Sequence, residues 1–372
     1  MKYKQGQKAL LVLEDGTVFE GKAAGKIGTT GGEIAFNTGM TGYQEIFTDP
    51  SYYGQLLIMT TAHIGNYGVH PDEVESDSVK IEGLVCKKFS DIFSRAASEE
   101  SIQDYCDREN LIAISDIDTR ALTRHIRDKG AMNAIISSEI LDVDVLRQKL
   151  TEVPSMVGLE LSSKVSTKEA YDFGSSESEL KVAVIDYGTK RNILRCLDER
   201  GCALKVFPMN TSVQTILDWK PDGIMLSNGP GDPAAMKESV TQIQQVLEAN
   251  IPVFGICLGH QLLSLAVGLP TYKMHNGHRG INHPVQNLIT GKSEITSQNH
   301  GFVVSREEAE KRTDITVTHI HLNDDSLAGI KLNDKPVFSV QFHPESSAGP
   351  NDSRYLFDDF VQLIRQHKMV IV

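Results

Sequence analysis

The chain has no long hydrophobic run and few cysteines. None of its apolar segments approaches the roughly 20 residues that a membrane-spanning helix needs, and residues 1–20 lack the apolar core of a signal peptide. Its five cysteines are an odd number without C-x-x-C spacing, which argues against a disulfide framework and against a zinc site. We therefore expect a cytoplasmic protein with reduced thiols and no membrane partner.

Positive charge and phosphate-binding patterns are also scarce. The 372 residues carry 37 lysines and arginines against 49 aspartates and glutamates, a net charge of −12. Nucleic acids bind basic surfaces, so this balance argues against a nucleic-acid partner. The pattern G-x-x-x-x-G-K-[ST] is absent, and the glycines of 25–32 lack the lysine and helix of a phosphate cradle. We expect no ATP site and no cofactor on this chain.

Twelve histidines are scattered along the sequence, and three of them raise the question of a metal. His275 and His278 lie near His283, but no carboxylate or thiol beside them completes a ligand set. We therefore interpret them as loop histidines and expect no metal site.

The length exceeds that of one typical domain, which favours two. Two alternating segments within residues 8–23 flank Asp15-Gly16, a pattern typical of a hairpin. We expect an α+β domain over residues 1–162. Its further β segments are expected at 33–37 and 55–61, and its helices at 99–109, 119–128 and 140–150.

Residues 163–179 are polar and rich in serine, which predicts a linker. From Leu180 the sequence alternates regularly between strand and helix patterns, which predicts a doubly wound α/β domain over 180–372 with its chemistry at the carboxyl ends of the strands. The expected strands are 182–186, 203–208, 223–227 and 253–257; the expected helices are 191–199, 213–219, 240–249 and a closing helix at 352–367.

Cys257 is the strongest candidate for chemistry. It lies between Gly255 and Gly259, after an apolar run that predicts a buried strand and before a helical pattern. The G-x-C-x-G spacing is the thiol form of a nucleophile elbow, and a helix N-terminus favours thiolate over thiol. The alternative is a buried, inert cysteine.

A nucleophile of this kind needs a base and a group that orients the base. The run Val337-Phe-Ser-Val-Gln-Phe342 alternates like a strand and ends at His343, and Pro344 directs the chain so that Glu345 can reach the imidazole. Taken alone, His-Pro-Glu is also consistent with an ordinary turn.

Together these runs resemble the class I, triad-type glutamine amidotransferases. Leu226-Ser-Asn-Gly-Pro-Gly-Asp-Pro233 and Ser297-Gln-Asn-His-Gly-Phe302 match the same family. In the first half, Phe36-Asn-Thr-Gly-Met-Thr-Gly-Tyr-Gln-Glu45, His63-Ile-Gly-Asn-Tyr-Gly68 and Asp116-Ile-Asp-Thr-Arg120 resemble the N-terminal domain of one branch, the small subunits of carbamoyl-phosphate synthetases. The resemblance covers essentially the whole chain.

The resemblance implies a Cys257–His343–Glu345 triad that hydrolyses glutamine. It implies a glutamine-binding set of Gly229, Gly231, Leu258, Gln261, Asn299, Gly301 and Phe302. The residues alone are equally consistent with structural roles. Gln261 could be an exposed helix residue, Asn299 and Gly301 could form a structural turn, and Gly229-Pro-Gly231 could form a plain loop. Some members of the family carry a serine that contacts glutamine at the position where this chain has Gly39. We therefore expect the backbone N–H of Gly39 to contact glutamine in place of that hydroxyl.

The resemblance also implies a partner. Ammonia released into water is protonated, so a glutaminase of this kind is expected to dock on a large synthetase subunit that uses ATP and magnesium to make carbamoyl phosphate for arginine or pyrimidine synthesis. There are three alternatives. The chain could serve another synthetase (anthranilate, aminodeoxychorismate or GMP), it could be a free-standing cysteine hydrolase, or it could be a catalytically silent subunit.

Overall fold

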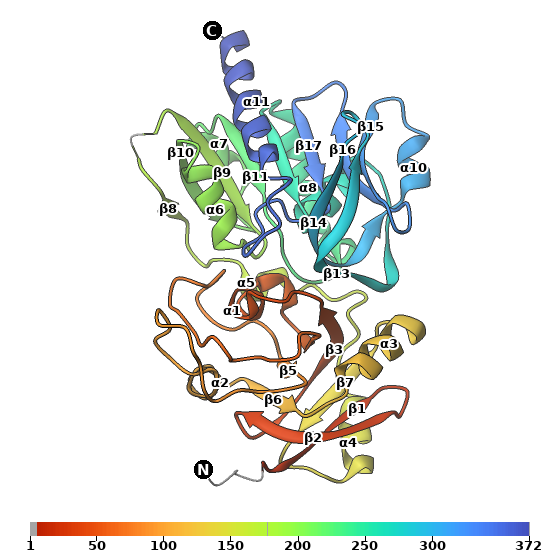
Figure 1. The fold of residues 1–372 in the computed structure, drawn as a ribbon. Helices are drawn as coiled ribbons and strands as arrows, with labels where there is room; N and C mark the ends of the chain where they lie inside the picture. Colours follow the sequence, from red (N-terminus) through yellow and green to blue (C-terminus); the bar gives the residue numbers. More distant parts are fainter. Residues whose placement is uncertain (1–5, 177, 372) are drawn as a thin grey trace. The chain divides into compact units, whose positions relative to one another are not determined.

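The computed structural model describes residues 6–176 and 178–371 and divides the chain into two compact units, Met1–Met156 and Val157–Val372 (Figure 1). Each unit has hydrophobic clusters of its own. The expected fold class, an α+β domain followed by a doubly wound α/β domain, is confirmed.

The first unit is built on a closed barrel with the strand order β1-β2-β6-β5-β4-β3-β7. The hairpin predicted about Asp15-Gly16 joins β1 to β2, and Gly16 has a φ of 88°, which a turn glycine accepts without strain. The strands are β1 (Lys8–Leu13), β2 (Val18–Gly25), β3 (Thr29–Asn37), β4 (Gln55–Met59), β5 (Gly83–Val85), β6 (Ile112–Ser115) and β7 (Asn133–Ser137).

Short helices cover the barrel of the first unit. Alternate strand residues face different apolar clusters, as the period of two in a strand requires: Leu11 packs with α3, whereas Leu10 and Val12 pack with α4. The helices are α1 (Tyr43–Phe47), the 3₁₀ turn η1 (Pro50–Tyr52), α2 (Ile102–Glu109), α3 (Thr119–Lys129) and α4 (Val143–Leu150).

The second unit contains a ten-stranded sheet with the order β14-β13-β15-β16-β17-β12-β11-β9-β10-β8. Its strands are β8 (Tyr171–Phe173), β9 (Leu180–Asp186), β10 (Cys202–Pro208), β11 (Gly223–Leu226), β12 (Val253–Ile256), β13 (Thr271–Asn287), β14 (Ser293–Val304), β15 (Ile315–His321), β16 (Leu327–Leu332) and β17 (Val337–Val340). Its helices are α5 (Ser162–Val165), α6 (Arg191–Asp198), α7 (Val213–Asp218), η2 (Pro233–Ala235), α8 (Lys237–Glu248), α9 (Leu258–Ala266), α10 (Arg306–Glu310) and α11 (Tyr355–Ile371).

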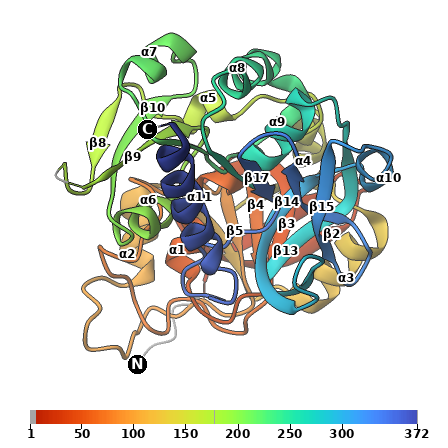
Figure 2. The ribbon, with the colours of Figure 1, turned by 90° about the horizontal axis from the view of Figure 1, so that it is seen from above.

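Five neighbouring strands of this sheet are parallel and form its doubly wound part, β10-β9-β11-β12-β17. Helices α7, α8 and α9 cover one face and α6 and α11 the other, which Figure 2 shows from above. Within β9, Ala183 and Ile185 contribute to the first face and Val182 and Val184 to the second. In such a sheet, ligands bind outside the carboxyl ends of the strands, so a ligand site is expected beside the residues that follow β9, β11, β12 and β17.

Two details differ from the sequence-based expectations. The segment 163–179, predicted as a linker, belongs to the second unit: α5 overlaps its start, and β8 is an edge strand of the sheet, paired with β10. Its polar composition reflects an edge position, since an edge strand faces solvent. His275, His278 and His283, predicted in a loop, all lie on β13, whose length comes from pairing with β14 and not from apolar residues.

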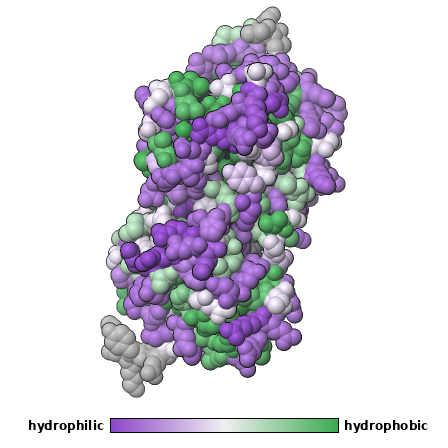
Figure 3. Space-filling model, turned by 90° about the vertical axis from the view of Figure 1, so that its right-hand side faces the viewer, coloured by the Kyte–Doolittle hydropathy of each residue, from purple (hydrophilic) through white to green (hydrophobic). Residues whose placement is uncertain are grey.

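The surface of the chain is mixed. Hydrophilic residues cover most of the face in Figure 3, with smaller apolar areas between them. Within residues 6–176 and 178–371, no helix is both long enough and apolar enough to cross a bilayer.

Candidate active site

Cys257 occupies a sharp turn between β12 and α9. It is 2% exposed, it is the N-cap residue of α9, and its φ of 53° is one that residues with a side chain rarely adopt. The two flanking glycines are needed for close packing: a Cβ on Gly259 would lie 2.3 Å from the carbonyl oxygen of Leu226, and one on Gly255 would lie 3.0 Å from the backbone of Gly259. The predicted elbow is therefore present.

His343 reaches the same edge of the sheet from the neighbouring strand β17. The backbone N–H of Cys257 donates to the carbonyl of Val340 at 2.9 Å, and the N–H of His343 donates to the carbonyl of Ser297 at 2.9 Å. The imidazole Nδ1 lies 2.7 Å from Oε1 of Glu345, and both side chains are fully buried. The other ring nitrogen, Nε2, is buried, and the side chain of Cys257 interacts with the ring.

A buried lysine, which the sequence analysis missed, joins this pair. Lys190 lies in the segment between β9 and α6, and its Nζ is 2.6 Å from Oε1 of Glu345. Burial alone would raise the pKa of Glu345, but the charges of Lys190 and His343 outweigh it and hold that pKa below 4.5. Glu345 is therefore an anion at neutral pH.

The charge of His343 follows from its neighbours. Burial and the Lys190 cation favour the neutral ring, but the Glu345 charge and the neighbouring Cys257 side chain outweigh them and raise the pKa of His343 above 6.5. The arrangement therefore favours an imidazolium next to the cysteine, a charge that suits the activation of a thiol nucleophile.

Three of the predicted glutamine-binding residues meet beside the thiol. The Gln261 amide donates to the carbonyl of Phe302 at 2.8 Å, and the carbonyl of Asn299 lies 3.7 Å from the Cys257 sulfur. Gln261 is 3% exposed, so it is not a solvent-exposed helix residue. Asn299, Gly301 and Phe302 lie inside β14 and do not form a turn.

The remaining predicted residues of this unit lie on the segments around the elbow. Leu258 is the first residue of α9. The loop of Gly229 packs against it, since a Cβ on Gly229 would lie 2.8 Å from Cδ2 of Leu258 and 2.2 Å from the carbonyl oxygen of Tyr187. Gly231 has a φ of 98° and bridges to Glu160, whereas Gly301 is packed beside Lys273 and Arg279.

Gly39 belongs to the first unit, and its backbone N–H already has a partner. It donates to Oδ1 of Asn37 at 2.6 Å. The expectation that this N–H is available to a substrate is therefore not supported, because the side chain two residues earlier turns back onto it.

Two further polar residues escaped the sequence analysis. The Gln341 amide donates to the Cys257 sulfur at 3.7 Å and accepts from Gln261 at 3.0 Å, and Arg279 donates to Oδ1 of Asn299 at 2.6 Å. Gln341 was detectable, since it opens the run Gln-Phe-His-Pro-Glu; Lys190 follows a parallel strand at the edge where ligands bind. No sequence pattern around Arg279 indicated a functional role for it.

Comparison with known proteins agrees with this geometry. Residues 183–363 match the family model of class I glutamine amidotransferases, and residues 11–136 match that of the CPSase domain of carbamoyl-phosphate synthase small chains. The carbamoyl phosphate synthase small chain of Escherichia coli K12 is 48% identical over 97% of this chain and 98% of its own. That of Thermosynechococcus vestitus is 48% identical over 97% of each.

Relatives of one family thus match the chain at nearly full length, and the second half carries the elbow and the buried His–Glu pair at the expected edge of the sheet. The chain belongs to the family of carbamoyl phosphate synthase small chains and contains a class I glutamine amidotransferase domain.

Proposed function

We propose that this chain hydrolyses glutamine through Cys257, His343 and Glu345 and supplies the ammonia to a carbamoyl phosphate synthase large chain. The observation that carries the proposal is the buried His343–Glu345 pair beside Cys257, at the carboxyl ends of two adjacent parallel strands. Membership in the small-chain family supports glutamine as the substrate.

The reaction proceeds in two halves. The Cys257 thiolate attacks the side-chain amide carbon of glutamine, and the C–N bond breaks as the His343 imidazolium gives its proton to the leaving ammonia. His343, now neutral, takes a proton from water, whose oxygen attacks the thioester carbon. The C–S bond breaks, which releases glutamate with its acid proton lost to solvent and restores the Cys257 thiolate beside the His343 imidazolium. Glu345 holds the ring through Nδ1, and Lys190 fixes Glu345 as an anion.

The oxyanion and the substrate need donors that the helix and its loops supply. The first N–H groups of a helix have no intrahelical partner, so that of Leu258 is our candidate oxyanion donor, together with one from the Gly229–Gly231 loop. We assign glutamine recognition to Gln261, Asn299, Gly301 and Phe302. The network through Gln341 and Arg279 supports this assignment, because it fixes Gln261 and Asn299.

The partner follows from the fate of ammonia. Ammonia released into water is protonated, so glutamine hydrolysis serves synthesis only within a closed complex. We propose that the partner is a large chain that uses ATP and magnesium to make carbamoyl phosphate. We place the complex in the cytoplasm, in arginine or pyrimidine synthesis; the five free cysteines support a reducing compartment. A free-standing hydrolase is the main alternative, and the match of residues 11–136 to the CPSase domain disfavours it.

Replacement of Cys257 by serine should abolish glutamine-dependent synthesis of carbamoyl phosphate, by about 10⁴-fold or more, and leave the ammonia-dependent reaction intact. Only amide hydrolysis uses the thiol. Both rates are measured in the complex with the large chain, and Cys202→Ala, a change at a buried cysteine of β10, is the control. Normal glutamine use by Cys257→Ser would refute the assignment.

Replacement of His343 by asparagine should lower glutamate release by about 10²–10⁴-fold, the usual contribution of a general acid–base. Glu345→Gln should cost less, because the carboxylate orients the ring and transfers no proton. Initial rates of glutamate formation decide the comparison, with the exposed Glu307→Gln as control. Equal losses at both positions would mean that Glu345 takes part in proton transfer.

Replacement of Lys190 by methionine should destabilise the second unit by about 3 kcal/mol at neutral pH, because it leaves a buried carboxylate with His343 alone. The folded-state pKa of Glu345 is lowered, so its ionic stabilisation is complete above pH 4.5 and is lost as pH falls below that value. The difference between variant and native protein should therefore shrink below pH 4.5.

Denaturant unfolding followed by the fluorescence of Trp219, the single tryptophan, measures this difference in the second unit. The exposed Lys237→Met is the control. A difference that stays constant from pH 7 to pH 3 would show that the Lys190–Glu345 ion pair is not its source.

The isolated chain should release glutamate slowly, and the large chain with bicarbonate and ATP should accelerate it strongly, because uncoupled hydrolysis wastes glutamine. Glutamate release is measured with the full chain alone and in the complex. A full chain that by itself runs at the rate of the complex is a free-standing hydrolase.

A further inference from the structure

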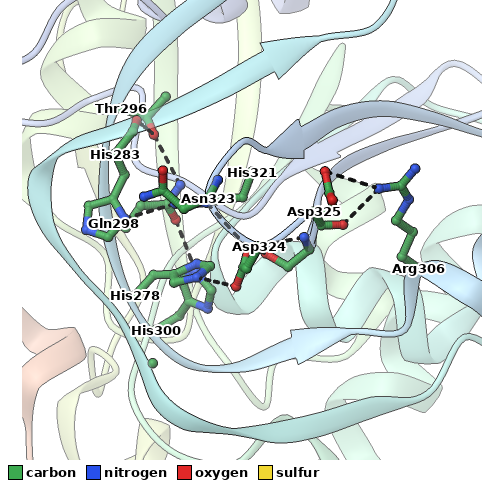
Figure 4. A network of polar contacts seen from close by, with 12 residues as sticks. His278, His283, Thr296, Gln298, His300, Arg306, His321, Asn323, Asp324 and Asp325 are labelled. Atoms are coloured by element: carbon green, nitrogen blue, oxygen red, sulfur yellow. Dashed lines mark hydrogen bonds and ion pairs between the residues drawn. The ribbon is translucent and has the colours of Figure 1, made fainter. Parts of the chain in front are cut away.

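A cluster of imidazoles lies on β13, β14 and β15, outside the catalytic triad (Figure 4). His278 and His283 come from β13, His300 from β14 and His321 from the last position of β15. The rings of His278 and His321 are stacked with their centroids 4.0 Å apart, and that of His300 lies 5.0 Å from His278. Asp324, in the turn after β15, reaches into the cluster.

Three of these side chains point ligand atoms at one another. His278 Nε2 lies 2.8 Å from one Asp324 oxygen, and His321 Nδ1 lies 3.4 Å from the other. All three ligand atoms lie within 4.8 Å of one another. Ligand atoms around a tetrahedral zinc ion, bound at about 2.0–2.1 Å, are roughly 3.3 Å apart, so adjustments of well under 2 Å would complete the geometry.

The hydrogen bonds of His321 leave its ligand atom with a lone pair. Nδ1 accepts from the backbone N–H of Asn323 at 3.2 Å, so it carries no proton, and the neutral ring has its proton on Nε2. A metal at Nδ1 takes the place of this long contact with Asn323. Nε2 lies 2.9 Å from Nδ1 of His283 and is the donor in that contact. This is the tautomer that a metal needs, since a ligating histidine usually donates its other N–H to a neighbour.

We propose that His278, His321 and Asp324 bind a divalent transition metal of the zinc type. Two imidazoles and one carboxylate suit zinc and its first-row neighbours, whereas calcium and magnesium prefer oxygen ligands throughout. The metal replaces the present contact between His278 and Asp324, and His278 then carries its proton on Nδ1. Water completes the coordination.

The three proposed ligands differ in burial, and the most exposed of them gives a metal ion a way into the site. His321 is 2% exposed and His278 is 11% exposed at the side chain, but Asp324 is 41% exposed. A hydrated ion can therefore meet Asp324 first and exchange water for the two imidazoles. On the side away from the proposed metal, His321 is hydrogen-bonded to His283, and His283 is hydrogen-bonded to the backbone of Arg279.

The test uses the full chain without a polyhistidine tag, in the Cys257→Ser background, so that the elbow thiol cannot bind metal. After dialysis against a chelator, Zn²⁺ or Co²⁺ is added, and bound metal is measured by equilibrium dialysis and elemental analysis. We expect one ion per chain. We also expect the intense visible bands of tetrahedral Co²⁺, without the near-ultraviolet band of a thiolate ligand.

Asp324→Asn should weaken Zn²⁺ binding by at least tenfold, and so should His278→Asn. Matched controls lie close by on the chain: Asp325→Asn next to Asp324, and His275→Asn, an exposed histidine on the same strand. Asn at 324 keeps the oxygen that accepts from Ser326, so this variant retains its turn, and circular dichroism checks its fold.

Full affinity in Asp324→Asn and His278→Asn, or an equal loss in the two controls, would overturn the proposal. So would Co²⁺ spectra of an octahedral, fully hydrated ion at saturating metal. Neither outcome bears on the glutaminase assignment, because the ligands are separate from the triad.

Discussion

The parallel pairing of β12 with β17 is the constraint on which the candidate active site depends. Its register runs from Val253 opposite Val337 to Ile256 opposite Val340, and the N–H of Cys257 adds one more bond to the same ladder. Because both strands end at one edge, the nucleophile and the base, far apart in sequence, arrive side by side. A one-residue slip would turn every side chain of β17 to the opposite face.

The same edge can hold charge only because the charges compensate one another. Glu345 is fully buried, and an isolated carboxylate there would take up a proton. Lys190 from the β9 edge and His343 from the β17 edge both contact its Oε1 atom, so three side chains from separate segments fix one protonation pattern. The cation of Lys190 also opposes a positive charge on His343, but it does not outweigh Glu345 and Cys257, and the pKa of His343 stays raised.

Sequence patterns predicted those parts of the site whose residues are neighbours in the sequence. Cys257 was found because its glycines and flanking elements are contiguous, and His343 and Glu345 because a proline fixes their spacing. Lys190 was not found, since nothing near it in sequence shows that it meets Glu345. The length of β13 was missed for a similar reason: its polar residues form a strand because β14 and β15 pair with it.

The β13–β14 ladder relates the imidazole cluster to the candidate glutamine site. His278 pairs with His300, and the next pair is Arg279 with Asn299. Successive pairs of a ladder point to opposite faces, so the imidazoles lie on one face and the Arg279–Asn299 contact on the other. Asn299 holds its carbonyl against the Cys257 thiol. A metal ion bound between His278 and Asp324 would therefore act on the strand pair that positions Asn299, without any contact with glutamine.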